Sequence, residues 1–179
     1  MSNCSSSADE AIPLCIVNDD PSQISSPLIP LLLHSAIRNN ATKIIEYLLV
    51  NNLIKDNQEV DSNNTSALML AVQYQQFHLI NHLTSTISLQ DNSGTTALMR
   101  AVEFDFQDVF TPLLAEISIQ DNAGITALMI SAMNGNASWF PKLIQEVDIL
   151  DNDQMSVFQI CKMRGTEDLV KQLQNLQEK

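Results

Sequence analysis

The sequence predicts an all-α protein, a solenoid of about five helix-turn-helix repeats. The first observation behind this prediction is the stretch DNSGTTALM at residues 91–99, which returns thirty residues later as DNAGITALM at 121–129. A weaker copy begins at Asp61 and a more divergent one at Asp151, so four aspartates recur at intervals of thirty residues. A fixed period of this size is typical of a repeat array.

The second observation is a set of positions that stay apolar in every copy. Apolar residues three or four positions apart give a helix one buried stripe, and one copy alone could not bury that stripe. We therefore expect the second helices of neighbouring copies to share a core, with Trp139 buried in it. The three columns are Ile44, Leu79, Val109, Trp139 and Leu169; Ile45, Ile80, Phe110, Phe140 and Val170; and Leu48, Leu83, Leu113, Leu143 and Leu173.

The third observation divides the chain into an arm and a repeat domain. Residues 1–27 are rich in serine and contain three prolines, which disfavour a continuous helix, so we expect an irregular N-terminal arm there. Residues 28–179 form the predicted repeat domain, with repeats starting near 28, 61, 91, 121 and 151. The apolar segment 12–17 of the arm is expected to cover the first helix pair, which has no repeat before it.

Composition narrows the classes of partner. The 179 residues carry a net charge of −12 and no cluster of Lys or Arg, which argues against nucleic acid and against an anionic membrane surface. No apolar run approaches the roughly 18 residues that span a bilayer. The three cysteines, Cys4, Cys15 and Cys161, lack metal-site spacing, and their odd number is typical of free thiols. We therefore expect a cytoplasmic location, with the nucleus as the alternative.

The sequence offers little catalytic or metal-binding chemistry. His78 and His82 are four residues apart, but no nearby cysteine completes a zinc site. The Asp-Asn-x-Gly turns lack the remaining carboxylates of a calcium loop. No nucleophile is placed beside a base, and glycine is too scarce for a phosphate loop. We expect a protein that is not an enzyme and that uses no cofactor and no metal.

The repeated motif resembles the ankyrin repeat. The residues that match are Asp91, Gly94, Thr96, Leu98, Ala101, Leu113 and Leu114 in one copy and Asp121, Gly124, Thr126, Leu128, Ala132, Gly135, Leu143 and Ile144 in the next.

The resemblance spans about 28–179 and has clear departures from the family. Met69, Met99 and Met129 replace the usual histidine, which only His34 keeps. Gln75 and Asp105 stand where the family has a glycine between its helices, so a positive φ there would cost stability. These short repeats are rich in methionine.

The resemblance implies a non-catalytic module, an adaptor or scaffold, that binds another protein through a concave surface. The alternatives are a regulatory or structural subunit of a larger complex and a metal-binding protein. We expect a monomer whose partner has some basic character, because Glu103 and Asp105 lie beside the expected site. The candidate partner-binding residues are Gln73, Tyr74, Asn92, Ser93, Thr95, Glu103, Phe104, Asn122, Ile125, Met133, Asn134, Met163 and Arg164.

Overall fold

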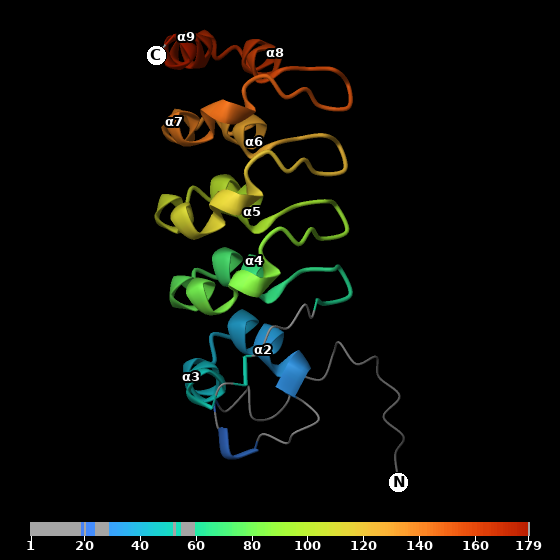
Figure 1. Cartoon of the computed structure of the whole chain (residues 1–179), viewed down its shortest axis with the longest axis vertical. Coiled ribbons are helices and arrows are strands. Elements are labelled where there is room, and N and C mark those ends of the chain that lie inside the picture. Colours follow the sequence, from blue (N-terminus) through green and yellow to red (C-terminus); the bar gives the residue numbers. More distant parts are fainter. Residues whose placement is uncertain (1–18, 20, 24–28, 52, 55–59, 179) are drawn as a thin grey trace.

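The computed structural model of the chain describes residues 19, 21–23, 29–51, 53–54 and 60–178. Helical layers stack along the long axis of the molecule, and a hairpin loop projects to the same side before each of α4, α5, α6 and α8 (Figure 1). Among the described residues, β-structure is limited to two isolated bridges, Val60–Ser66 and Leu150–Ser156. The predicted all-α solenoid is confirmed.

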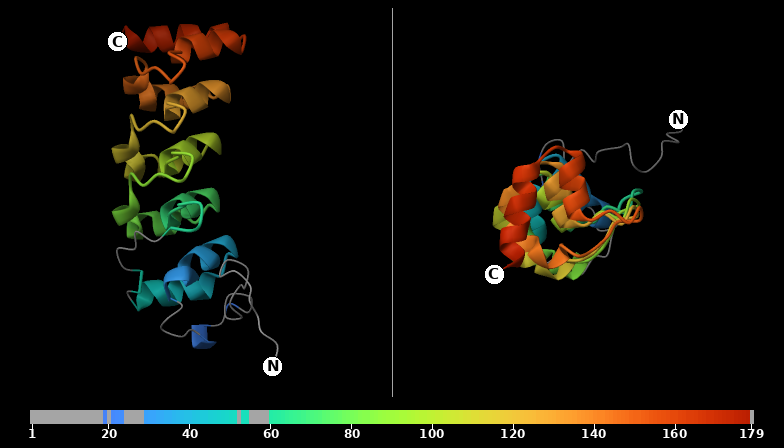
Figure 2. Two further views of the ribbon diagram at one scale, coloured as in Figure 1. Left: turned by 90° about the vertical axis from the view of Figure 1, so that its right-hand side faces the viewer. Right: turned by 90° about the horizontal axis from the view of Figure 1, so that it is seen from above.

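Each repeat consists of two helical segments joined by a tight turn. The first segments form one column of the stack, and the second segments form another beside it (Figure 2). The first segments are α2 (Ile29–Arg38), α4 (Ala67–Gln73), α5 (Ala97–Glu103), α6 (Ala127–Met133) and α8 (Val157–Met163). The second segments are α3 (Thr42–Val50); η3 (Phe77–His82) with η4 (Thr84–Thr86); η5 (Gln107–Val109) with η6 (Thr111–Glu116); η7 (Ala137–Trp139), α7 (Phe140–Leu143) and η8 (Ile144–Glu146); and α9 (Glu167–Gln177).

The second segments of the three central repeats are mostly 3-10 helix rather than α-helix, a difference from the sequence expectation. A 3-10 helix rises about 2.0 Å per residue, against 1.5 Å in an α-helix. The short thirty-residue period leaves few residues for the second segment, and in a 3-10 helix these few residues still span the width of the repeat. Proline also interrupts two of these segments, at Pro112 and Pro141, each near the start of a helical segment. Proline has no backbone N–H, so it cannot donate the hydrogen bond by which an α-helix would continue from the preceding turn. The terminal segments α3 and α9 remain α-helical.

The shared core lies between the two columns of helices, as the periodic apolar positions predict. Trp139 and Phe140 are fully buried, and the leucine column from Leu48 to Leu173 is buried throughout. Phe110 and Val170 are only partly buried but pack against this core. Lys162 is exposed in the last repeat, where the aligned residues of earlier repeats are buried and apolar. Among the described residues, this buried apolar column therefore extends from Ile37 to Ala132.

The described part of the N-terminal arm holds the first helix pair in place. The Asp19 carboxylate accepts hydrogen bonds from the backbone N–H groups of Lys43 (3.1 Å) and Ile44 (3.0 Å), in the first turn of α3. It thereby acts as an N-cap, which the Ala41 side chain cannot do. The short η1 (Pro21–Gln23) lies close to α3. Segment 12–17 lies outside the described residues, so its covering role stays a prediction.

The turn between the two helical segments requires a left-handed backbone in every repeat. The residue at this position has φ = 53° at Asn40, 58° at Gln75, 61° at Asp105, 73° at Gly135 and 69° at Gly165. The expectation that Gln75 and Asp105 occupy strained glycine positions is therefore confirmed.

Replacing Gln75 with Gly is expected to raise the free energy of unfolding by about 0.5–1 kcal/mol, because glycine adopts a positive φ without steric cost. Chemical denaturation followed by circular dichroism would measure the change. As a matched control, Lys162→Gly, at an exposed α-helical position, should instead cost about 1 kcal/mol. A loss of stability in Gln75→Gly would contradict the prediction.

Candidate binding face

The hairpin loops, which we call the fingers, are built by the four periodic aspartates. Oδ1 of Asp91 accepts hydrogen bonds from the backbone N–H groups of Ser93 and Thr95, both at 2.9 Å. Asp61, Asp121 and Asp151 make the same two bonds in their own fingers. The chain then turns at Gly94, where φ is 83° and a Cβ atom would lie 2.5 Å from the backbone nitrogen of the next finger. Each finger is thus fixed by its own sequence and by its neighbour.

Hydrogen bonds also connect each finger to the next. The Asn122 side-chain amide donates to the Asn92 carbonyl (2.9 Å), and the Asn152 amide repeats this bond to the Asn122 carbonyl at the same distance. The Gln90 side-chain amide bridges the carbonyls of Gly94 and Gln120. The Asn92 side-chain amide donates in the same way to the Ser62 carbonyl (3.3 Å). The candidate residues Asn92 and Asn122 therefore have a structural role, because their amide groups hold the row of fingers together.

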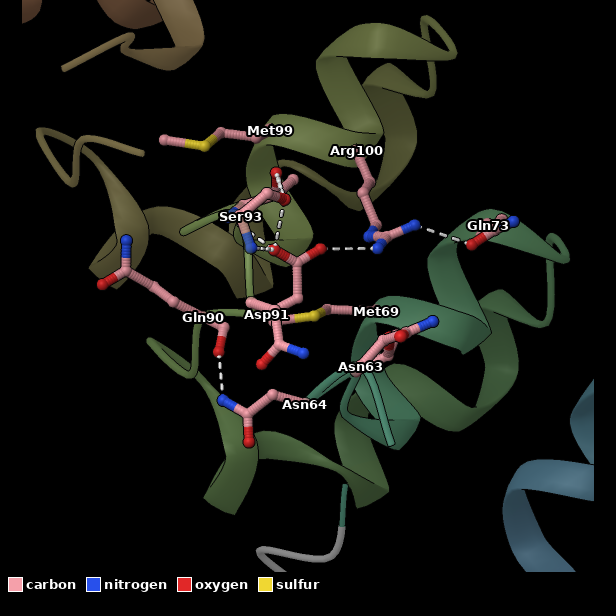
Figure 3. Close-up of polar contacts among 12 residues, drawn as sticks. Asn63, Asn64, Met69, Gln73, Gln90, Asp91, Ser93, Met99 and Arg100 are labelled. Carbon is pink, nitrogen blue, oxygen red and sulfur yellow. Dashed lines mark hydrogen bonds and ion pairs between the residues drawn. The ribbon is translucent and has the colours of Figure 1, made fainter. Parts of the chain in front are cut away.

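An arginine lies where a finger meets the first helix of its repeat. Arg100 donates through Nη2 to Oδ2 of Asp91 (2.8 Å) and through Nη1 to the Gln73 side-chain oxygen (2.7 Å), as Figure 3 shows. Burial alone would raise the pKa of Asp91, but hydrogen bonds from Ser93, Thr95 and Arg100 outweigh it and lower the pKa. The carboxylate is therefore held charged by the protein itself. Among the described residues no group of three potential ligands could hold a metal ion.

The ends of the first helices present apolar side chains to solvent. Tyr74, Phe104 and Arg164 cap the C-termini of α4, α5 and α8, and Met163 is the last residue of α8. Tyr74 is 41% exposed, Phe104 44% and Met163 75%. The Phe104 ring also stacks on Phe106, with centroids 5.8 Å apart. These rings are thus partly exposed rather than folded into the core.

The remaining candidate residues lie around these helix ends and on the fingers. Gln73 and Met133 are partly buried, whereas Glu103 and Asn134 are exposed and connected by a long hydrogen bond of 3.5 Å. On the fingers, Ser93 is exposed and its hydroxyl binds Asp91 (2.6 Å) and lies 3.0 Å from the Thr95 hydroxyl.

One pocket brings four of the candidate residues together. It has a volume of about 240 Å³ and opens between the last two repeats, where their fingers meet α6 and α8. Sequence reasoning missed three of its residues, although the period of the aspartates points to Asp151. The candidates in the lining are Ile125, Met133, Met163 and Arg164, and the residues that were missed are Asp151, Met155 and Ile160.

Comparison with known families agrees with this geometry. A family model of ankyrin repeats, in three copies, matches residues 33–123. The chain belongs to the ankyrin-repeat family. No curated protein matches the chain. After the matched region the structure has two further repeats of the same construction, one from α6 to η8 and one formed by α8 and α9.

Ankyrin repeats are generally protein-protein interaction modules, and the family is typically non-catalytic.

In this ankyrin protein, Nε2 of the buried His34 lies 3.2 Å from the Thr65 carbonyl oxygen, on the finger of the next repeat. Burial lowers the pKa of His34. Met69, Met99 and Met129 are fully buried, so apolar packing takes the place of this hydrogen bond in later repeats. Within the described residues, no helix has the length and apolarity to cross a membrane.

Proposed function

We propose that this ankyrin protein is an adaptor or scaffold that binds another protein through its inner face. The inner face consists of the fingers together with the exposed ends of α4, α5, α6 and α8. The observation that carries the proposal is the exposure of large apolar side chains at these helix ends, at Tyr74, Phe104 and Met163, of which Met163 also lines the pocket between the last two repeats. Exposed apolar residues are ordinary singly, but a group on one face is typical of a contact site.

The side chains of this face suit a protein partner. Tyrosine and phenylalanine bury much area at low entropic cost and are frequent anchors of interfaces, and methionine adapts to irregular surfaces. Glu103 is exposed beside Phe104, and the whole chain carries a net charge of −12, so we propose a partner with a basic surface. We propose further that the protein acts as a monomer in the cytoplasm, with the nucleus as the alternative location. A permanent subunit role is the alternative to an adaptor or scaffold, and the size of the native complex would distinguish the two.

The double substitution Tyr74→Ala with Phe104→Ala is expected to reduce partner capture at least several-fold while leaving the fold intact. Both rings are partly exposed, so their removal opens no closed cavity but takes two anchors from the inner face. Affinity capture from the native cell, followed by mass spectrometry, would compare the variant with the wild-type protein.

A matched control removes two apolar side chains from another face. Val50 is 84% exposed and Leu114 is 49% exposed, and both lie on second helical segments, so Val50→Ala with Leu114→Ala should leave capture unchanged. If the Tyr74 and Phe104 variant still captured every partner, the inner-face proposal would be wrong. Unfolding of that variant would instead assign the two rings to the core.

A further inference from the structure

Two of the four finger aspartates are paired with an arginine of the same chain. Oδ2 of Asp91 binds Arg100 at 2.8 Å, and the same guanidinium reaches Gln73. Oδ2 of Asp61 forms an ion pair with Arg38, which comes from the first helix of the preceding repeat. In both fingers Oδ1 holds the turn and Oδ2 receives the cation. The fold therefore contains a built site for a guanidinium group at the base of a finger.

Sixty residues after the Asp91 site, the same positions contain no arginine. Asp151 corresponds to Asp91, Met133 corresponds to Gln73 and Ile160 corresponds to Arg100. Oδ1 of Asp151 accepts the backbone N–H groups of Asp153 (2.9 Å) and Met155 (2.8 Å), just as in the other fingers. Within the described part of the chain, no cationic side chain forms an ion pair with its Oδ2. The residue is nevertheless only 4% exposed, so an acidic side chain is buried without a cation from this part of the chain.

The pocket between the last two repeats lies at this position. It is lined by Asp151 together with the apolar side chains of Met133, Met155, Ile160 and Met163. A carboxylate among apolar walls complements a side chain that has a long methylene stem and a charged end. At Asp121 the arginine position is also apolar, with Ile130, but Asp121 is less buried than Asp151.

We propose that this pocket receives an arginine side chain of the partner protein, which supplies from outside the cation that Arg100 supplies to Asp91 from within. The methylene stem lies between Met133 and Met163, and the guanidinium pairs with Oδ2 of Asp151. Arginine is proposed rather than lysine because it is the cation that the fold already places against Oδ2 of two finger aspartates, at Arg38 and Arg100, and because its weakly hydrated guanidinium suits a partly buried ion pair. Arg164 also lines the pocket, but it is exposed, and among the described residues no ion pair joins it to Asp151. This inference rests on the proposed function, because it assigns a chemistry to part of the inner face.

The test uses a small probe and the full-length chain. N-acetyl-arginine N-methylamide is titrated into protein labelled with carbon-13 at the methionine methyl groups, and the norleucine analogue serves as the uncharged probe. The arginine probe is expected to shift the methyl signals of Met133, Met155 and Met163, which line the pocket, more than that of Met129, which is fully buried in the core. Equal shifts with the norleucine probe, or no shift with either probe, would overturn the proposal.

Two sets of variants examine the charge and the missing arginine. Asp151→Asn keeps an oxygen that can accept the two turn hydrogen bonds but removes the charge, so binding should weaken by roughly tenfold or more. The matched control, Asp121→Asn, makes the same change one finger earlier and should leave binding unchanged. Ile160→Arg with Met133→Gln rebuilds the site of Arg100 and Gln73, so its own arginine should fill the pocket and abolish probe binding. Retained binding in Asp151→Asn or in the rebuilt variant would contradict the proposal.

The outcome of this test is separable from that of the proposed function. The Tyr74→Ala and Phe104→Ala variant lacks two inner-face anchors but keeps the pocket, so it should bind the arginine probe as the wild type does. A pocket that fails to bind the probe, in a protein whose partner capture still depends on Tyr74 and Phe104, would reject only the arginine site. Probe binding that depends on Asp151, with capture unaffected by Tyr74 and Phe104, would reject only the wider inner-face proposal.

Discussion

Replacing Trp139 with Ala is expected to lower the free energy of unfolding by about 3–5 kcal/mol, because removal of a large buried side chain leaves a cavity in the shared core. The Trp139 side chain is fully buried, in the core between the two columns of helices. In a solenoid each repeat contacts only its neighbours, so the loss would fall on the interface between the third and fourth repeats.

Trp139 contributes more than volume to that interface. Its indole N–H donates to Oδ1 of Asp105 at 2.9 Å, which joins it to the left-handed turn of the preceding repeat. Its ring meets Phe110 edge to face, with centroids 5.9 Å apart, and Nζ of Lys142 lies 5.1 Å from the indole centroid. Aromatic and cation-π contacts add roughly 0.5–1 kcal/mol each beyond the area that is buried. The bond to Asp105 also explains why aspartate is useful at a position that otherwise favours glycine.

Chemical denaturation would measure the effect, with Trp139→Phe as the control that keeps most of the volume but loses the indole N–H. We expect Trp139→Phe to cost about 1–2 kcal/mol, clearly less than Trp139→Ala, because only the hydrogen bond and part of the ring are removed. A cost below about 1 kcal/mol for Trp139→Ala would contradict the buried position of this residue.

The stack and most of its core could be predicted because repetition multiplies a weak signal. A single apolar residue such as Leu113 says little, but five aligned copies of its column define a buried stripe. The left-handed turns at Gln75 and Asp105 were predictable because the ankyrin family has a glycine at that position, and glycine stands there in the last two repeats of this chain. The resemblance to the ankyrin repeat supplied the rest of what could be predicted about the fold.

The pocket and the buried glutamates were not predictable because they depend on departures from the repeat. The pocket exists where Ile160 replaces the arginine of an earlier repeat, and a substitution of this kind looks like ordinary variation in the sequence. Glu116 and Glu146 align with Thr86 and Leu176, so their column has no common chemistry. Their burial depends on contacts between repeats, which the period alone does not describe.

Glu116 and its counterpart Glu146 connect neighbouring repeats from within the core. Glu116 is only 2% exposed, and its two carboxylate oxygens accept separate backbone hydrogen bonds. Oε1 binds the N–H of Ser88 (3.0 Å), after the second segment of the preceding repeat, and Oε2 binds the N–H of Leu98 (2.6 Å), in the first turn of α5. A carboxylate at a helix N-terminus is also favoured by the helix dipole. Glu146 repeats this arrangement with Ser118 (2.8 Å) and Leu128 (2.7 Å).

Replacing Glu116 with Ala is therefore expected to lower the free energy of unfolding by about 3 kcal/mol, because it leaves a cavity and removes the acceptor of the buried Leu98 N–H and of the partly buried Ser88 N–H. Since the geometry recurs thirty residues later, Glu146→Ala should cost a similar amount. Chemical denaturation of both variants would test this, with Glu167→Ala, an exposed residue in the first turn of α9, as the control. A loss in Glu116→Ala no larger than in this control would mean that the carboxylate does not support the interface.

The pH dependence of Glu116→Gln distinguishes the charge of this carboxyl from its shape. Burial raises the pKa of Glu116 above its ordinary value of 4.5, although the bonds from Leu98 and Ser88 oppose the rise. A carboxyl whose pKa is raised by folding contributes stability that is fully present below its unfolded pKa and is lost as the pH rises through its folded pKa. The free energy of unfolding of the wild type relative to Glu116→Gln should therefore fall as the pH rises above 4.5. Asp61 and Asp91, whose pKa values are lowered by folding, are present in both proteins and cancel in this difference. A difference that increases with pH would show that the folded protein favours the charged carboxylate.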